Sequence, residues 1–94
     1  MRVFWTIEAQ QDRADIFDYI AGGNPQAAIR MDELFSKATG RLMKHPMVGR
    51  MGHVEATREL IVHKSYRLVY EIVDDTVWVL TIVHTARQWP PIRE

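Results

Sequence analysis

Apolar residues return every three or four positions in two stretches of the first half of the chain, 9–20 and 27–42, with polar residues between them. This spacing predicts two amphipathic helices, each with one apolar face. Thr6, ahead of the first stretch, is a favourable cap because its hydroxyl can accept a hydrogen bond from a free amide of the first turn. Asn24 followed by Pro25 predicts the start of the second helix, since proline fits the first helical position.

The second half changes to short runs of β-branched and aromatic residues, a composition typical of strands. The sequence predicts strands over 58–63, 66–73 and 76–84. Lys64–Ser65 and Asp74–Asp75 separate these strands, and both pairs suit two-residue hairpin turns. We therefore expect three consecutive antiparallel strands at the end of the domain.

A short aromatic run, 2–6, predicts one more strand ahead of the helices. The resulting order is β-α-α-β-β-β, an α+β fold in which the N-terminal strand and a helical hairpin pack on one face of a mainly antiparallel sheet. The stretch 44–57 contains two glycines and a proline and predicts a loop, whose length favours a functional role. We expect one domain over 1–94.

The two-residue turns also predict the register of the strands, and hence which side chains share a face. One face is nearly all apolar and is expected to pack on the helices; it carries Ile61, Leu68, Tyr70, Ile72, Val77, Val79, Thr81 and Val83. The other face is mixed and is expected to stay partly open; it carries Arg58, Leu60, Val62, Arg67, Val69, Glu71, Trp78, Leu80, Ile82 and His84.

Two contacts follow from this register. Arg58 is expected opposite Glu71, where the two side chains would form an exposed cross-strand ion pair. Arg67 is expected one diagonal from His84 on the open face, within reach of its ring. The register thus predicts an arginine and a histidine side by side at the end of the last strand.

Composition narrows the class of protein. The chain is 47% hydrophobic and 26% charged, which predicts a folded domain, and its twelve basic and twelve acidic residues cancel. A zero net charge argues against a dedicated nucleic-acid binder. The absence of cysteine fits a reducing cytoplasm, and no apolar run approaches the roughly 20 residues of a membrane span.

Few residues suggest metal or acid–base chemistry. The histidines do not have the spacing of a known ligand set, so neither a metal nor another cofactor is expected; they are His45, His53, His63 and His84. Glu59 is expected beside Tyr70 on the helix side of the sheet. There a structural role is favoured over that of a general base.

Five motifs appear in a characteristic order: "NPQAA" at the second helix, "HPMVGRMG" in the loop, then "TRELIV", "YRLVYEI" and "VHTARQWP" in the final strands. Together with the β-α-α-β-β-β order, they resemble the RelE/ParE superfamily of bacterial toxins over nearly the whole chain. The resemblance implies a cytoplasmic growth inhibitor of a type II toxin–antitoxin pair, of the kind linked to plasmid stabilisation. It also implies a cognate antitoxin, bound in a heterodimer or heterotetramer.

The superfamily has two branches with different targets. RelE-like members are ribosome-dependent mRNA endonucleases, and the resemblance places Arg67, His84 and Arg87 at their catalytic positions. ParE-like members inhibit DNA gyrase and carry no known nuclease site. This chain lacks the lysines and the C-terminal tyrosine of the RelE-like pattern, so a ParE-like gyrase inhibitor is favoured. A third hypothesis is an inactive homologue that only binds its antitoxin.

The residues expected to contact a target or antitoxin lie on the open face, on the loop and on the tail after the last strand. They are Arg50, Arg58, Arg67, Val69, Trp78, Leu80, His84, Arg87, Gln88 and Trp89. Trp78 is the favoured anchor for the antitoxin, because tryptophan is enriched among binding hot spots. Two prolines follow Trp89 and are expected to end the sheet, since proline cannot donate to a strand ladder.

Overall fold

The computed structural model describes residues 1–86 and 89–90 of the 94-residue chain. Its elements are β1 (Arg2–Trp5), α1 (Ile7–Ala21), α2 (Pro25–Lys44), β2 (Arg50–Met51), β3 (Thr57–His63), β4 (Tyr66–Val73) and β5 (Thr76–His84). The predicted α+β fold is confirmed. The predicted loop also contains the two-residue strand β2, which the sequence analysis did not foresee.

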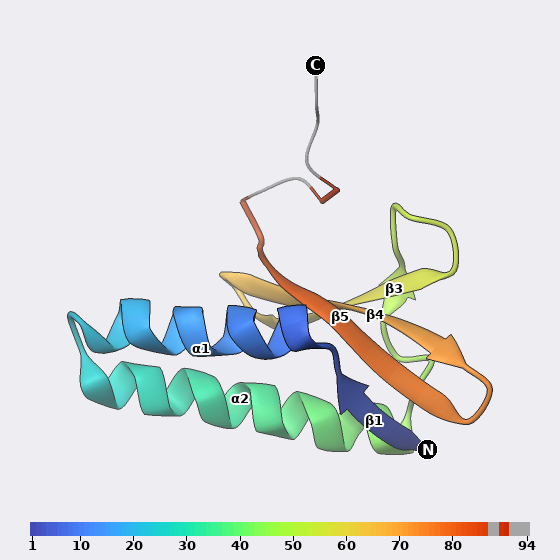
Figure 1. The fold of residues 1–94 in the computed structure, drawn as a ribbon, viewed down its shortest axis with the longest axis horizontal. Coiled ribbons are helices and arrows are strands. Elements are labelled where there is room, and N and C mark those ends of the chain that lie inside the picture. Colours follow the sequence, from blue (N-terminus) through green and yellow to red (C-terminus); the bar gives the residue numbers. More distant parts are fainter. Residues whose placement is uncertain (87–88, 91–94) are drawn as a thin grey trace.

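The five strands form one sheet in the order β1-β5-β4-β3-β2, with β1 parallel to β5 and every other pair antiparallel. The two helices lie side by side along one face of this sheet, as Figure 1 shows. The domain therefore has two layers, and none of the helices in the described residues covers the second face of the sheet.

The predicted helix caps are both present. The hydroxyl of Thr6 accepts a hydrogen bond from the amide of Ala9, and the side chain of Asn24 accepts one from the amide of Ala27, each at 3.1 Å. These bonds satisfy amides that the first turn of a helix leaves without a partner. The start of each helix is therefore fixed by local sequence.

The core forms between α2 and the sheet. Phe35 of α2 is fully buried and meets the rings of Trp5 and Tyr66 edge-on, with centroids 6.4 and 6.1 Å apart. Apolar burial of this kind is the main stabilising contribution in a domain of this size. The buried core residues around Phe35 are Ala9, Met31, Ala38, Leu42, Leu60, Leu68, Tyr70, Val77, Val79 and Ile82.

The register departs from the prediction at one place in each hairpin. The β3–β4 pairing shifts between Ile61 and His63, so that Leu60 lies opposite Leu68. The β4–β5 pairing shifts at the Val69–Tyr70 step, so that Val69 lies opposite Thr81. Each shift is a β-bulge, which inserts one extra residue and reverses the alternation of side chains beyond it.

The predicted faces are correct near the β4–β5 turn and wrong beyond the bulges. Leu60, Val62 and Ile82 pack on the core rather than on the open face. Ile61 and Val83 lie opposite Arg67 on its two sides, and therefore on the open face. The two-residue turns were predicted correctly, but no local pattern indicated the extra residue farther along each hairpin.

A side chain from α1 supports the bulge in β5. One carboxylate oxygen of Asp12 accepts hydrogen bonds from the amide of Ile82 at 3.1 Å and from the hydroxyl of Thr81 at 2.6 Å. The hydroxyl of Thr6 donates to the carbonyl of Leu80 at 3.0 Å. These bonds occupy polar groups that an irregular strand leaves out of the ladder.

Candidate functional site

Arg67 and Glu59 form a buried ion pair in the middle strands of the sheet. Their residues are 6% and 2% exposed, and Nε of Arg67 lies 2.8 Å from Oε1 of Glu59. The two atoms form an ion pair, but the direction of the N–H bond does not meet the geometry of a hydrogen bond. A terminal nitrogen of Arg67 also lies 3.5 Å from the carbonyl of Thr85, at the end of β5.

The predicted place of Glu59 was wrong. It lies opposite Val69, and Tyr70 lies opposite Arg58, so Glu59 faces the open side of the sheet together with Arg67. The reason is again the bulge in β3, which shifts the pairing of the strand by one residue. A glutamate directly before the apolar run Leu60–Val62, with an arginine in the next strand, was the signal that could have predicted this pair.

The carboxylate of Glu59 also holds the loop after β2. Its Oε2 lies 3.4 Å from both the amide and Nδ1 of His53, and its Oε1 lies 3.8 Å from Nη2 of Arg50. Burial raises the pKa of Glu59, but the hydrogen bonds from His53 and the charge of Arg67 outweigh it, and the pKa is held below its usual range. Glu59 is therefore the centre of a cluster formed with Arg50, His53 and Arg67.

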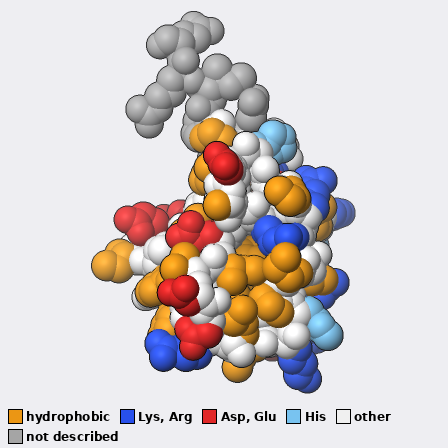
Figure 2. All heavy atoms as spheres, turned by 90° about the vertical axis from the view of Figure 1, so that its right-hand side faces the viewer, with side chains coloured by type: hydrophobic (Ala, Val, Ile, Leu, Met, Phe, Trp, Pro, Cys, Tyr) orange, Lys and Arg blue, Asp and Glu red, His pale blue; other side chains and the backbone are white. Residues whose placement is uncertain are grey.

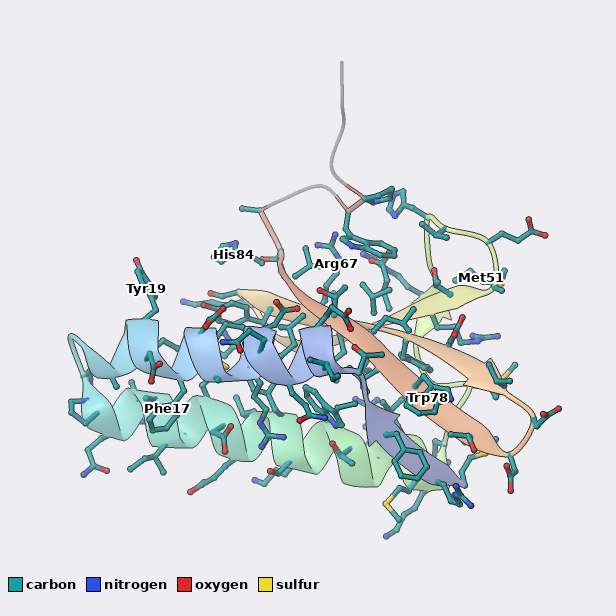
Figure 3. All side chains as sticks on the ribbon, viewed as in Figure 1. Phe17, Tyr19, Met51, Arg67, Trp78 and His84 are labelled. Atoms are coloured by element: carbon teal, nitrogen blue, oxygen red, sulfur yellow. The ribbon has the colours of Figure 1, made fainter. Side chains whose placement is uncertain are left out.

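His84 lies on the opposite side of the sheet from Arg67. It is paired with Tyr66, and the two rings meet edge-on with centroids 5.4 Å apart. Tyr66 in turn packs on Phe35 of α2, so this pair faces the helices. The predicted diagonal contact between Arg67 and His84 is wrong, because the bulge in β5 turns the end of that strand over. Figure 3 shows His84 toward the end of α1 that carries Tyr19.

His84 borders a groove of about 610 Å³ between α1 and the ends of β4 and β5. Its described lining residues are Asp12, Asp15, Ile16, Tyr19, Tyr66, Ile82, His84 and Ala86. Isoleucine and tyrosine side chains supply apolar lining, two aspartates supply negative charge, and these described residues include no lysine or arginine. Such a groove suits an apolar segment that carries a basic side chain.

The remaining predicted contact residues are scattered. Arg58 does not pair with Glu71; it donates to the carbonyl of Gly49 at 2.7 Å and to that of Met47 at 3.3 Å, which holds the loop before β2. Val69 is fully buried and therefore not a contact residue, Leu80 and Trp89 are half-buried, and Trp78 is exposed. Arg87 and Gln88 lie outside the described residues.

Gly49 is another feature that the sequence analysis missed. Its amide donates to the hydroxyl of Tyr70 at 2.9 Å, and that hydroxyl donates to the carbonyl of Pro46 at 2.7 Å. Burial raises the pKa of Tyr70, so the phenol stays protonated and can donate.

In the described part of the chain, no group of three or more histidine, aspartate or glutamate side chains is placed to hold a metal ion.

Residues 3–89 match the sequence model of the family described as "ParE toxin of type II toxin-antitoxin system, parDE". The chain belongs to the ParE toxin family. It is also 35% identical to a protein of Sinorhizobium fredii, Y4kP, whose name marks it as a candidate toxin, over 97% of this chain and 95% of that one. The resemblance to the RelE/ParE superfamily is thereby confirmed.

Solved structures from both branches of the superfamily share the fold of this ParE-family chain. The chromosomal ParDE toxin–antitoxin system of P. aeruginosa matches with a TM-score of 0.79 at 19% identity, over 89% of this chain and 95% of that one. The toxin–antitoxin complex RelBE2 of Mycobacterium tuberculosis matches with a TM-score of 0.62 at 27% identity, over 88% and 95%. In the described residues, no helix is long and apolar enough to cross a membrane.

Proposed function

We propose that this chain is a toxin that stops growth by binding DNA gyrase, and that a cognate antitoxin neutralises it. The observation that carries the choice of gyrase is the separation of Arg67 from His84 on opposite faces of the sheet. A ribosome-dependent endonuclease built on these two residues would need both at one phosphate. Binding to a protein target needs no such convergence.

Cleavage of RNA needs a base for the 2′-hydroxyl, a cation for the phosphate and an acid for the leaving oxygen. Each must lie within about 3 Å of the atom that it serves. Here the ring of His84 lies against Tyr66 on the helix side, whereas Arg67 lies on the open side. The charge of Arg67 is also balanced by the carboxylate of Glu59 at 2.8 Å, which disfavours its use for a phosphate.

The overall charge supports the same choice. Twelve basic and twelve acidic residues give the chain no net charge. A toxin that enters the ribosome meets densely spaced RNA phosphates and gains affinity from a surplus of lysine and arginine. A protein that binds gyrase in the cytoplasm has no such requirement.

The proposed antitoxin follows from the relatives and from the groove beside α1. The P. aeruginosa and M. tuberculosis matches are toxin–antitoxin systems by name. The groove has apolar lining and two aspartates and is large enough for an apolar stretch of a partner chain. We propose that the antitoxin occupies this groove and covers the helical hairpin, so that one toxin and one antitoxin form a heterodimer. Dimerisation of the antitoxin would then join two heterodimers into a heterotetramer.

Brief expression of the toxin, with supercoiling of a reporter plasmid and integrity of transcripts followed together, tests the proposal. We expect loss of negative supercoiling before any loss of transcripts. Codon-phased cuts in mRNA that disappear in Arg67→Ala and His84→Ala would instead show the endonuclease. Normal growth, with the antitoxin still bound in a pull-down, would identify an inactive homologue.

A further inference from the structure

Two aromatic side chains lie together on the face of the sheet that has no helix over it. Phe4 of β1 pairs with Trp78 of β5, and their rings are tilted by 32° with centroids 5.3 Å apart. Phe4 is 41% exposed and Trp78 is 36% exposed. Val73 is also exposed, and it lies opposite Thr76 in the β4–β5 hairpin, next to the turn.

The environment of Trp78 differs from that of Trp5, which lies in the next pair of the β1–β5 ladder, opposite Val79. The indole N–H of Trp5 donates to the hydroxyl of Thr39 at 3.2 Å, and its ring packs on Phe35 in the core. The indole N–H of Trp78 has no acceptor among the described residues. Trp78 thus offers a partner both an apolar ring and a donor, the combination that makes tryptophan common at the centre of interfaces.

Three carboxylates lie on one side of this aromatic pair. Glu71 lies directly opposite Trp78, and Asp74 and Asp75 form the exposed turn at the end of the same hairpin. One cation, Arg2, is placed over the ring of Phe4 with Cζ 5.0 Å from its centroid. Counted together, these three acids and one arginine carry a net negative charge. Figure 2, which views this end of the molecule, shows acidic side chains along one flank of an apolar area and basic side chains along the other.

The charge decides between two classes of partner. Exposed aromatic rings can stack on the bases of single-stranded nucleic acid, but such sites are combined with basic side chains that hold the backbone. Acidic side chains repel phosphate and attract a basic protein surface. A topoisomerase must present basic surface where it holds DNA, and this surface is complementary to the acidic patch.

We propose that Phe4 and Trp78 are the anchor by which this chain docks on a basic, DNA-facing surface of gyrase. In this complex, basic side chains of gyrase around the anchor would form ion pairs with Glu71, Asp74 and Asp75. This inference rests on the proposed function and adds the site through which it acts. The patch and the antitoxin groove are separate: Figure 3 shows Trp78 near the β4–β5 turn, and Tyr19 and His84 toward the other end of the sheet.

Binding of the purified toxin to gyrase, and inhibition of its supercoiling activity, test the anchor. We expect Trp78→Ala to raise the Kd by about 30-fold or more, the usual effect of truncating a hot-spot tryptophan. Ile29→Ala is the matched control for gyrase binding, because Ile29 is an apolar residue that is 45% exposed and lies on α2 of the helical hairpin, outside the aromatic patch. It should leave the Kd and the inhibition unchanged.

The charged rim has its own test. Asp74→Asn with Asp75→Asn keeps the shape of the turn, and asparagine tolerates the positive φ of 55° at position 74. We expect this double variant to bind gyrase several-fold more weakly at low salt and to show a smaller dependence of Kd on salt. Equal salt dependence in the double variant and the parent would contradict the electrostatic part of the proposal.

The outcomes separate the anchor from the proposed function. The Trp78→Ala variant must first be shown to fold, by circular dichroism, and to bind the antitoxin. If it then inhibits gyrase as strongly as the parent chain does, the proposed anchor is wrong but gyrase remains the target. If Trp78→Ala loses the antitoxin but keeps gyrase inhibition, the patch serves the antitoxin. If the parent chain neither binds nor inhibits gyrase, both proposals fail. Tight binding of a single-stranded oligonucleotide that Trp78→Ala abolishes would identify a nucleic-acid platform instead.

Discussion

Replacing Glu59 with glutamine should destabilise the domain strongly, although the side chain keeps its size. The substitution removes the charge that faces Arg67 at 2.8 Å, and the Arg67 side chain is 8% exposed. Breaking a buried ion pair by removing one partner typically costs about 3–5 kcal/mol, because the other charge stays buried. Arg67 keeps its contact with the Thr85 carbonyl, so we expect the lower end, about 3 kcal/mol.

Thermal and urea unfolding of the purified chain would measure this change. A loss of about 3 kcal/mol corresponds to a fall in Tm of roughly 15 °C for a domain of this size. Arg50→Gln is the matched control, since it removes a charge that also approaches Glu59, at 3.8 Å, but from a side chain that is 64% exposed. Exposed pairs contribute less than about 1 kcal/mol, so this variant should unfold close to the parent.

The double variant Glu59→Leu/Arg67→Met separates the charge from the shape. Replacing both charges with apolar side chains of similar volume is often neutral, so the double variant should recover most of the stability lost by Glu59→Gln. The reasoning is refuted if Glu59→Gln costs less than Arg50→Gln, or if the double variant is less stable than Glu59→Gln alone.

Three further predictions concern stability. Because the pKa of Glu59 is lowered in the folded chain, its contribution should be present at neutral pH and lost as pH falls through that lowered pKa, and Glu59→Gln should remove this part of a urea-midpoint titration. Gly49→Ala should cost about 1–3 kcal/mol in urea unfolding, since a Cβ would lie 2.6 Å from the hydroxyl of Tyr70, whereas Gly40→Ala, with nothing within 4 Å, should stabilise α2 by up to about 1 kcal/mol. Asp12→Ala should cost about 1–3 kcal/mol in the same assay, because it leaves the polar groups of the β5 bulge without their acceptor; an unchanged midpoint would contradict that role.

The elements of this fold could be predicted because their signals are local. Helical spacing, the caps at Thr6 and Asn24, and the turn residues each act within a few positions of the chain. The faces of the sheet could be predicted only as far as the first bulge. The bulge in β5 is held by Asp12, about seventy residues earlier in the chain, and no local pattern records that contact.

The site could be predicted in its residues but not in its geometry. Arg67 was identified as important, yet its partner is Glu59 rather than His84. One inserted residue in β5 was enough to cause this error, since it moves His84 to the face that packs on the helices. A match of residue types at the right strand positions therefore says little about cleavage until the register is known.

The same register leaves the aromatic pair intact, because Phe4 and Trp78 lie on the near side of the bulge. The turn fixes the β4–β5 pairing from Val73–Thr76 through Tyr70–Val79, as the sequence predicted. The part of the open face next to the β4–β5 turn, whose register the turn determines, carries the exposed rings of Phe4 and Trp78. The part beyond the bulge carries Arg67 and Glu59, whose charges neutralise each other. This division favours a toxin that acts through binding at one end of its sheet over one that acts through chemistry at the other.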